Sequence, residues 1–163
     1  MNLIEVALEY DRNNKPLKAA LTYEEIVQLN ESNLEIFLNL AVIYFLMMDY
    51  GFAEYHKISD EYLEKAEENF YKILKLAEKK FGRKSEIEFW KYYYKYIVIG
   101  EDISTKVFED IAKSGDSLIP FFHLFVLEKG SRYRKEATQL YEKIKLGRTA
   151  RERYIKSVLE TFI

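Results

Sequence analysis

The chain has 163 residues, of which 48% are hydrophobic and 32% are charged, and its formal net charge is −2. This composition excludes an intrinsically disordered chain, and the length suits one globular domain over 1–163. The absence of cysteine excludes a disulfide framework, thiol catalysis and thiolate metal sites. With only 6 Gly and 2 Pro to interrupt it, the chain is predicted to be all-α.

Neither the N-terminus nor the apolar runs indicate an export signal or a membrane anchor. Residues 1–14 carry Glu5, Glu9 and Asp11 within their apolar pattern, which is not typical of a signal peptide. The longest apolar run, 40–48, is far shorter than the roughly 20 residues that cross a bilayer. We therefore expect a cytoplasmic protein that is not bound to a membrane.

The first three predicted helices are separated by short polar turns. The first covers 3–12, and the second begins at Pro16, whose missing N–H costs nothing in a first turn, and ends before 30–33. The third follows this turn and continues to about Tyr50. It is apolar almost all round, so we expect it to form the centre of the core. Residues 51–59 either prolong this helix or form a loop.

Six further helices are predicted from capping residues and turn sequences. Ser59 is the predicted cap of the helix over 60–80, and Gly82 is predicted to close it. Gly100 is predicted to end the helix over 85–99, and Asp102 and Ser117 are the predicted caps of the helices over 102–113 and 117–130. The predicted ranges are 60–80, 85–99, 102–113, 117–130, 131–146 and 149–162.

One three-residue pattern recurs four times. It consists of a small residue, an aromatic residue four positions later and an isoleucine three positions after that. The copies are Ala19-Tyr23-Ile26, Ala66-Phe70-Ile73, Ser104-Phe108-Ile111 and Ala137-Tyr141-Ile144. These spacings place the three residues on one helix face, where the small residue lets two helices approach and the ring fills the space beside it. The fullest preceding helix carries Phe37, Leu40, Ala41 and Tyr44 on one face. Four such units predict stacked helical hairpins.

These units resemble tetratricopeptide repeats, in which an Ala-x3-aromatic helix follows a helix with a large–x2–apolar–small–x2–Tyr pattern. The resemblance covers almost the whole chain, in units 1–33, 34–81, 85–113 and 117–147 and a capping helix at 149–162. It implies an all-α, right-handed stack of about four antiparallel helix hairpins. The copies are spaced irregularly where the family period is about 34 residues. Tyr94 and Phe125 also occupy small-residue positions, and the closing proline is missing, so we expect an irregular superhelix.

The resemblance implies a binding groove on the inner, concave face, formed by the first helix of each unit. The residues expected in this mixed apolar and cationic groove are Leu38, Val42, Phe45, Lys91, Lys95, Phe122 and Val126. In some tetratricopeptide domains, basic residues at places corresponding to Lys91 and Lys95 grip the C-terminal carboxylates of a partner. The complete clamp is not expected, because apolar residues occupy its earlier positions. We therefore predict a protein- or peptide-binding adaptor, with a secretion chaperone or a toxin-neutralising (immunity-type) protein as the alternative.

Positive charge is concentrated near the C-terminus, where 128–156 contains ten basic and four acidic residues. The basic patch predicted from this segment comprises Arg132, Arg134, Arg148, Arg151 and Arg153. It is either a solvated surface, a patch for an anionic partner, or a head-to-tail contact in a homo-oligomer. Nucleic-acid binding through 129–156, with interleaved tyrosines stacking on bases, is the rival function, although the overall acidic charge argues against it.

No motif in the sequence indicates catalysis. It contains no glycine-rich phosphate loop, nucleophile elbow or zinc-protease helix. His56 and His123 belong to different units and have no neighbouring ligand set, and His123 is expected to be a hydrogen-bonded core or boundary residue. We therefore expect a protein that is not an enzyme and that holds no cofactor or metal.

Overall fold

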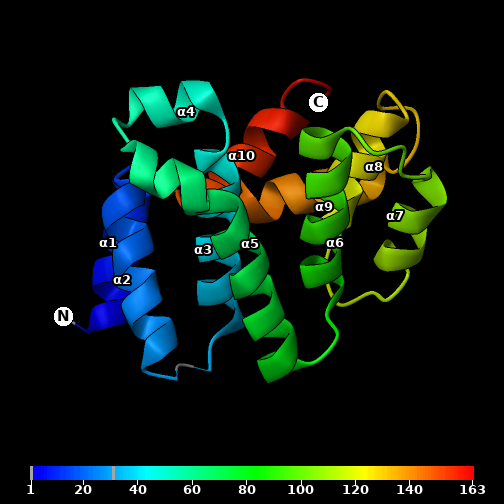
Figure 1. The fold of residues 1–163 in the computed structure, drawn as a ribbon. Coiled ribbons are helices and arrows are strands. Elements are labelled where there is room, and N and C mark those ends of the chain that lie inside the picture. The colour runs from blue at the N-terminus through cyan, green and yellow to red at the C-terminus, as the bar shows by residue number, and fades with distance from the viewer. Residues whose placement is uncertain (1, 31) are drawn as a thin grey trace. The chain divides into compact units, whose positions relative to one another are not determined.

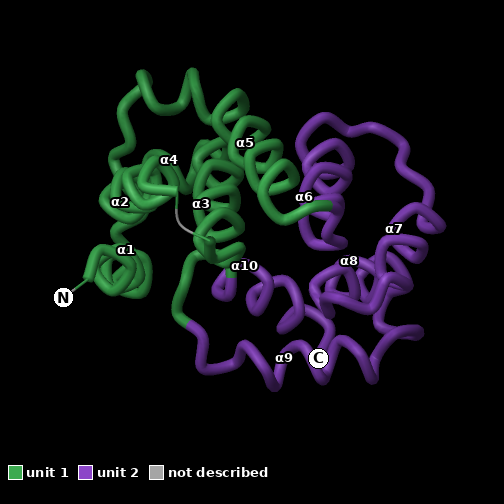
Figure 2. Tube along the Cα trace, turned by 90° about the horizontal axis from the view of Figure 1, so that it is seen from below, with its two compact units in different colours: residues 1–82, 148–151 green, residues 83–147, 152–163 purple. Residues whose placement is uncertain are grey.

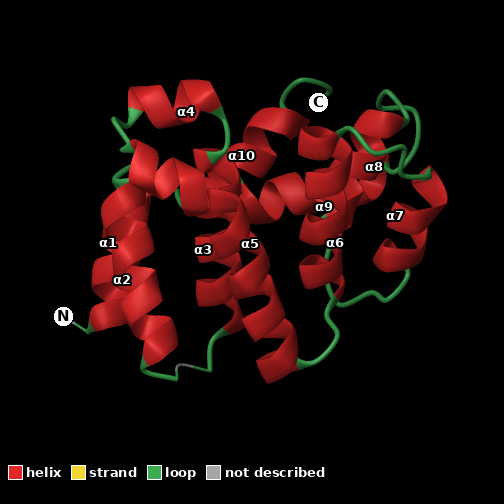
Figure 3. Ribbon diagram, in the orientation of Figure 1, coloured by secondary structure: helices red, strands yellow, loops and turns green. Residues whose placement is uncertain are grey.

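The computed structural model describes residues 2–30 and 32–163, and every regular element within them is a helix (Figures 1 and 3). This confirms the all-α prediction. In chain order, the helices are α1 (Leu3–Arg12), α2 (Pro16–Gln28), α3 (Leu34–Met47), α4 (Tyr50–Tyr55), α5 (Asp60–Phe81), α6 (Ser85–Tyr94), the π-helix η1 (Lys95–Ile99), α7 (Thr105–Ala112), α8 (Pro120–Leu127), α9 (Arg134–Ile144) and α10 (Ala150–Leu159).

The chain forms two compact units (Figure 2). Unit 1 comprises 1–82 and 148–151, and unit 2 comprises 83–147 and 152–163. The first two residues of α10 are therefore grouped with unit 1 and the rest of that helix with unit 2. A single domain over 1–163 stays a prediction.

Helix α3 is the core of unit 1. It has 14 residues and buries eleven of them, in contact with α2, α4 and α5. A helix that is apolar almost all round has to be covered on several sides, and these neighbours provide the cover. Helix α2 also contacts α1. Ala19 on α2, Ala41 on α3 and Ala66 on α5 are fully buried, which is where close packing needs small side chains.

A buried polar cluster in unit 1 joins α1 to the start of α10. One carboxylate oxygen of Asp11 accepts a hydrogen bond from the Tyr23 hydroxyl at 2.9 Å, and the other accepts one from the backbone N–H of Ala150 at 2.6 Å. The amide of Asn39 donates to the same tyrosine hydroxyl at 3.4 Å. Burial, followed by the charge of Asp11, raises the pKa of Tyr23 far above its ordinary value. The tyrosine therefore stays protonated and donates to the carboxylate.

The core of unit 2 is built mainly from aromatic rings. Helix α6 contacts α7 and α8, and α8 contacts α9. Trp90 and Phe122 are fully buried, with their ring centroids 6.2 Å apart. The hydroxyls of Tyr93 and Tyr154 are 2.7 Å apart, so each of these part-buried polar groups has a partner.

Several predicted boundaries change in the structure. Residues 51–55 belong to the separate helix α4, which Asp49 caps by accepting a hydrogen bond from the backbone N–H of Phe52, and 56–59 form the turn that follows. Asp102 does not cap α7; Ser104 does, by accepting from the N–H of Lys106 at 3.2 Å. The predicted helix over 85–99 changes from α to π geometry at Lys95.

The fourfold signature is also not uniform. Ser104 is exposed at the cap of α7, whereas the corresponding Ala19, Ala66 and Ala137 are fully buried. Tyr141 is only half-buried, and its hydroxyl donates to Glu160 at 3.1 Å. The small residue of the third copy and the ring of the fourth therefore do not pack in a core.

Candidate functional site

The predicted concave-face residues belong to both units and are mostly buried. In unit 1, Leu38, Val42 and Phe45 are at most 6% exposed, because α3 is covered on several sides. Their side chains therefore pack inside the unit and do not line an open surface.

The four residues of the predicted groove that belong to unit 2 differ in exposure. Phe122 is fully buried, whereas Lys91, Lys95 and Val126 are half-buried. The ammonium nitrogen of Lys95 lies 5.8 Å from the ring centroid of Tyr92, which is a cation–π distance. Lys91 and Lys95 stay a prediction as partner-binding residues.

Two arginines of the predicted basic patch belong to unit 1. Arg148 is exposed. Arg151 is 7% exposed, and its guanidinium donates to the carboxylate of Glu35. Its burial prevents Arg151 from contributing to an open basic surface.

Arg132, Arg134 and Arg153 belong to unit 2. Arg132 lies 3.4 Å from a carboxylate oxygen of Glu109 and 3.6 Å from one of Glu128. Arg134 donates to the carbonyl of Gly130 at 3.3 Å. Arg153 is half-buried. Much of the positive charge in this segment is therefore balanced or engaged within the fold.

A groove in unit 1 lies between α2 and α5, with α3 as its floor. We call it the α2–α5 groove. Leu40 and Tyr44 form the floor, Leu21 and Val27 belong to the α2 wall, and Leu76 belongs to the α5 wall. The hollow at its centre measures about 320 Å³.

A second hollow extends the groove along α5. It measures about 380 Å³ and shares Val27, Gln28 and Leu76 with the first, so the two hollows adjoin. Phe37 lines the second hollow as Leu40 and Tyr44 line the first. These three residues are spaced three and four positions apart, so a single face of α3 runs below the whole groove.

Apolar side chains on both walls are open to solvent. Leu21 is 44% exposed and Leu76 is 40% exposed, and they face the same hollow from different helices. Single exposed leucines are normal on a protein surface, but leucines gathered around a hollow are typical of a binding site.

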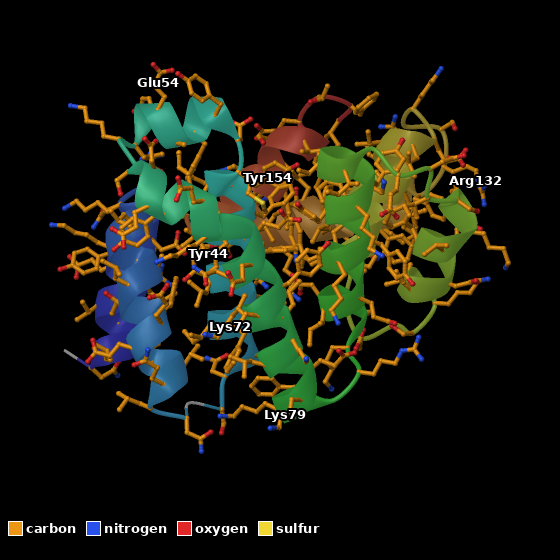
Figure 4. All side chains as sticks on the ribbon, in the orientation of Figure 1. Tyr44, Glu54, Lys72, Lys79, Arg132 and Tyr154 are labelled. Atoms are coloured by element: carbon orange, nitrogen blue, oxygen red, sulfur yellow. The ribbon has the colours of Figure 1, made fainter. Side chains whose placement is uncertain are left out.

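A half-buried carboxylate provides the polar group nearest the floor. Glu24 on α2 accepts a hydrogen bond from the hydroxyl of Tyr44. Burial raises the pKa of the Glu24 carboxyl above its ordinary value, while the positive charge of Lys72 acts to lower it. Tyr44 and Lys72 are labelled in Figure 4. This arrangement gives an otherwise apolar floor one point at which a ligand can be oriented by charge or hydrogen bonding.

Only weak signals in the sequence point to this groove. Phe37, Leu40 and Tyr44 stand out as one apolar face of α3, but the neighbouring face with Leu38 and Val42 looks just as apolar. Both faces are buried, and which of them lies below the groove depends on where α2 and α5 pack. An isolated leucine within a polar helix face, such as Leu76, was the remaining signal.

Comparison with known proteins adds no relative from which a site could be transferred. No protein-family model, no curated protein and no solved structure matches the chain.

Within residues 2–30 and 32–163, no helix combines the length and apolar character needed to span a bilayer. The same part of the chain contains no cluster of three or more histidine, aspartate or glutamate side chains arranged to hold a metal ion.

Proposed function

We propose that the protein is a peptide-binding adaptor and that its partner segment lies in the α2–α5 groove. The observation that carries this proposal is the pair of solvent-open leucines, Leu21 and Leu76, facing one hollow from two helices. Burial of such side chains by a partner is favourable at about 25 cal/mol per Å² of apolar surface. An adaptor would use this burial for affinity and the surrounding charges for selectivity.

The shape of the groove favours a peptide over a small molecule. Its two adjoining hollows follow α5 from Glu61 to Lys80, and helices border it on two sides. Sites for small ligands are enclosed on most sides, whereas an elongated groove with apolar anchors suits a chain segment.

We also propose that the protein is a degenerate member of the tetratricopeptide-like class. This is supported by the helix contacts in unit 1, α1 with α2, α2 with α3 and, beyond the short α4, α3 with α5. Burial of Ala7, Ala41 and the signature alanines of the second helices supports it as well. A secretion chaperone or a toxin-neutralising protein would use the groove in the same way, since both functions require capture of a segment of another protein.

A peptide-display selection against the full chain tests the proposed function. Selected peptides should bind the Leu76→Asp variant about tenfold or more weakly, because a carboxylate would replace an apolar anchor. Leu146→Asp is the matched control, since Leu146 is 87% exposed in unit 2. Fluorescence anisotropy gives the affinities, and circular dichroism checks that both variants are folded. Failure to recover a peptide, or equal binding to Leu76→Asp and wild type, would contradict the proposal.

A further inference from the structure

Three lysines form a row along the α5 wall of the α2–α5 groove. Lys65 and Lys72 line the first hollow and Lys79 lines the second. They are seven residues apart, so they lie on nearly the same side of α5 at intervals of about 10 Å. All three are exposed to solvent, and two of them are labelled in Figure 4.

Positive charge exceeds negative charge around the groove. Its lining contains four lysines, the three of the row and Lys80, and two glutamates, Glu24 and Glu61. Glu61 lies 3.8 Å from Lys65, and the ammonium of Lys80 is engaged by the carbonyl and side-chain oxygens of Asn30 at 2.7 and 2.9 Å. The balance at the α5 wall is therefore cationic, although the whole chain is slightly acidic.

We infer that the occupant of the α2–α5 groove is an acidic amphipathic helix of a partner protein, a specification that rests on the proposed function. Its apolar face packs on Leu21, Val27 and Leu76, and its carboxylates align with Lys65, Lys72 and Lys79. The lysine row repels a basic partner segment, so it supplies selectivity in addition to attraction.

The interval between the lysines favours a helix over an extended strand. A helix that runs beside α5 repeats its side chains at the same rise, so acidic residues seven apart meet successive lysines. In a strand, the same interval of about 10 Å corresponds to about three residues, and side chains three apart point to opposite faces. A strand could therefore not present carboxylates to consecutive lysines while keeping one apolar face on the groove.

Binding of three synthetic peptides to the full chain tests this inference. The fluorescein-labelled peptides share length, helix propensity and apolar positions, and they carry Glu, Gln or Lys at the positions that face α5. The Glu peptide should bind most tightly, by a factor on the order of ten over the Gln peptide, and the Lys peptide most weakly. The triple variant Lys65→Glu, Lys72→Glu, Lys79→Glu should reverse this order. A control triple, Lys129→Glu, Lys135→Glu, Lys143→Glu, makes the same change in net charge at exposed residues of unit 2 and should preserve it.

The possible outcomes separate the inference from the proposed function. Two results would overturn the acidic occupant and leave the peptide-binding function standing. One is equal affinity for the Glu and Gln peptides, and the other is an unchanged order of peptide affinities in the triple variant of Lys65, Lys72 and Lys79 (the groove triple). No binding of any of the three would contradict both. A wild-type dimer in analytical ultracentrifugation that the groove triple dissociates, without peptide binding, would assign the groove to a second copy of the chain and overturn the inference.

Discussion

His123 lies among aromatic rings in the core of unit 2 and is 3% exposed. Its ring centroid is 4.5 Å from that of Phe108 and 5.0 Å from those of Tyr93 and Tyr96. Nε2 has no hydrogen-bond partner among the described residues. Burial lowers the pKa of His123 to about 4. The sequence-based expectation of a core position is therefore correct, but this nitrogen is not hydrogen-bonded.

The pH dependence of stability should reflect this burial. The unfolded chain takes up a proton at His123 near pH 6.5, whereas the folded chain does so only near pH 4. Stability should therefore fall as the pH decreases through this interval, by about 3 kcal/mol from this residue. His123→Phe should remove that part of the pH dependence without loss of stability at pH 7. Urea unfolding at pH 7 and pH 5 measures it, and identical pH dependence in both proteins would contradict the assignment.

At the scale of single elements, the sequence predicted the helices whose ends have local chemical signals. Leu3–Arg12 agrees with its predicted bounds, and α2 begins at Pro16 as expected. The π geometry of η1 was not predictable, because it arises from a change of backbone hydrogen bonding at Lys95 and has no residue signature. The bounds of α8 and α9 were predicted too wide, since the turn between them extends through Tyr133.

The candidate groove was less predictable than the helices that form it. Local pattern shows that α3 is apolar on all sides, but it does not show which of its buried faces lies below the groove. Burial of Val42 and exposure of Leu76 follow from the packing contacts among the three helices α2, α3 and α5. Tertiary packing therefore decides the site, and a single sequence does not encode it in a readable pattern.

Substitutions at two equivalent signature positions should have different effects. Ala66 is fully buried on α5, so Ala66→Leu should overpack unit 1 and cost about 1 to 3 kcal/mol. Ser104 is exposed, and Ser104→Thr adds a methyl group while keeping a capping hydroxyl, so its effect should stay within about 0.5 kcal/mol. Chemical denaturation measures both, and equal destabilisation would show that the two positions have similar surroundings.

For the whole molecule, the main feature is that unit 1 is not continuous in sequence. Residues 1–82 form this unit together with 148–151, and Asp11 accepts a hydrogen bond from the backbone N–H of Ala150. Arg151 adds an ion pair with Glu35. Residues near both ends of the chain therefore contribute to the same folded unit.

Loss of the Asp11 carboxylate should be detectable far away in sequence. Asp11→Ala should destabilise the protein by about 2 kcal/mol, since it leaves the Tyr23 hydroxyl and the Ala150 N–H without their acceptor. Hydrogen–deuterium exchange should increase in peptides that cover 148–151 as well as in α1. Glu9→Ala, at an exposed position of the same helix, is the control. Unchanged exchange at 148–151 would refute this long-range attachment.

The bond from Ala150 to Asp11 has a consequence for biosynthesis. A ribosome makes α1 before α10, and it must add the whole segment 83–147 before it makes the residue that bonds to Asp11. Unit 1 therefore cannot reach its final state until most of unit 2 has been translated, because its last contacts involve 148–151. The hydrogen bond between the Asp11 carboxylate and the backbone N–H of Ala150 can therefore form only after Ala150 has been translated.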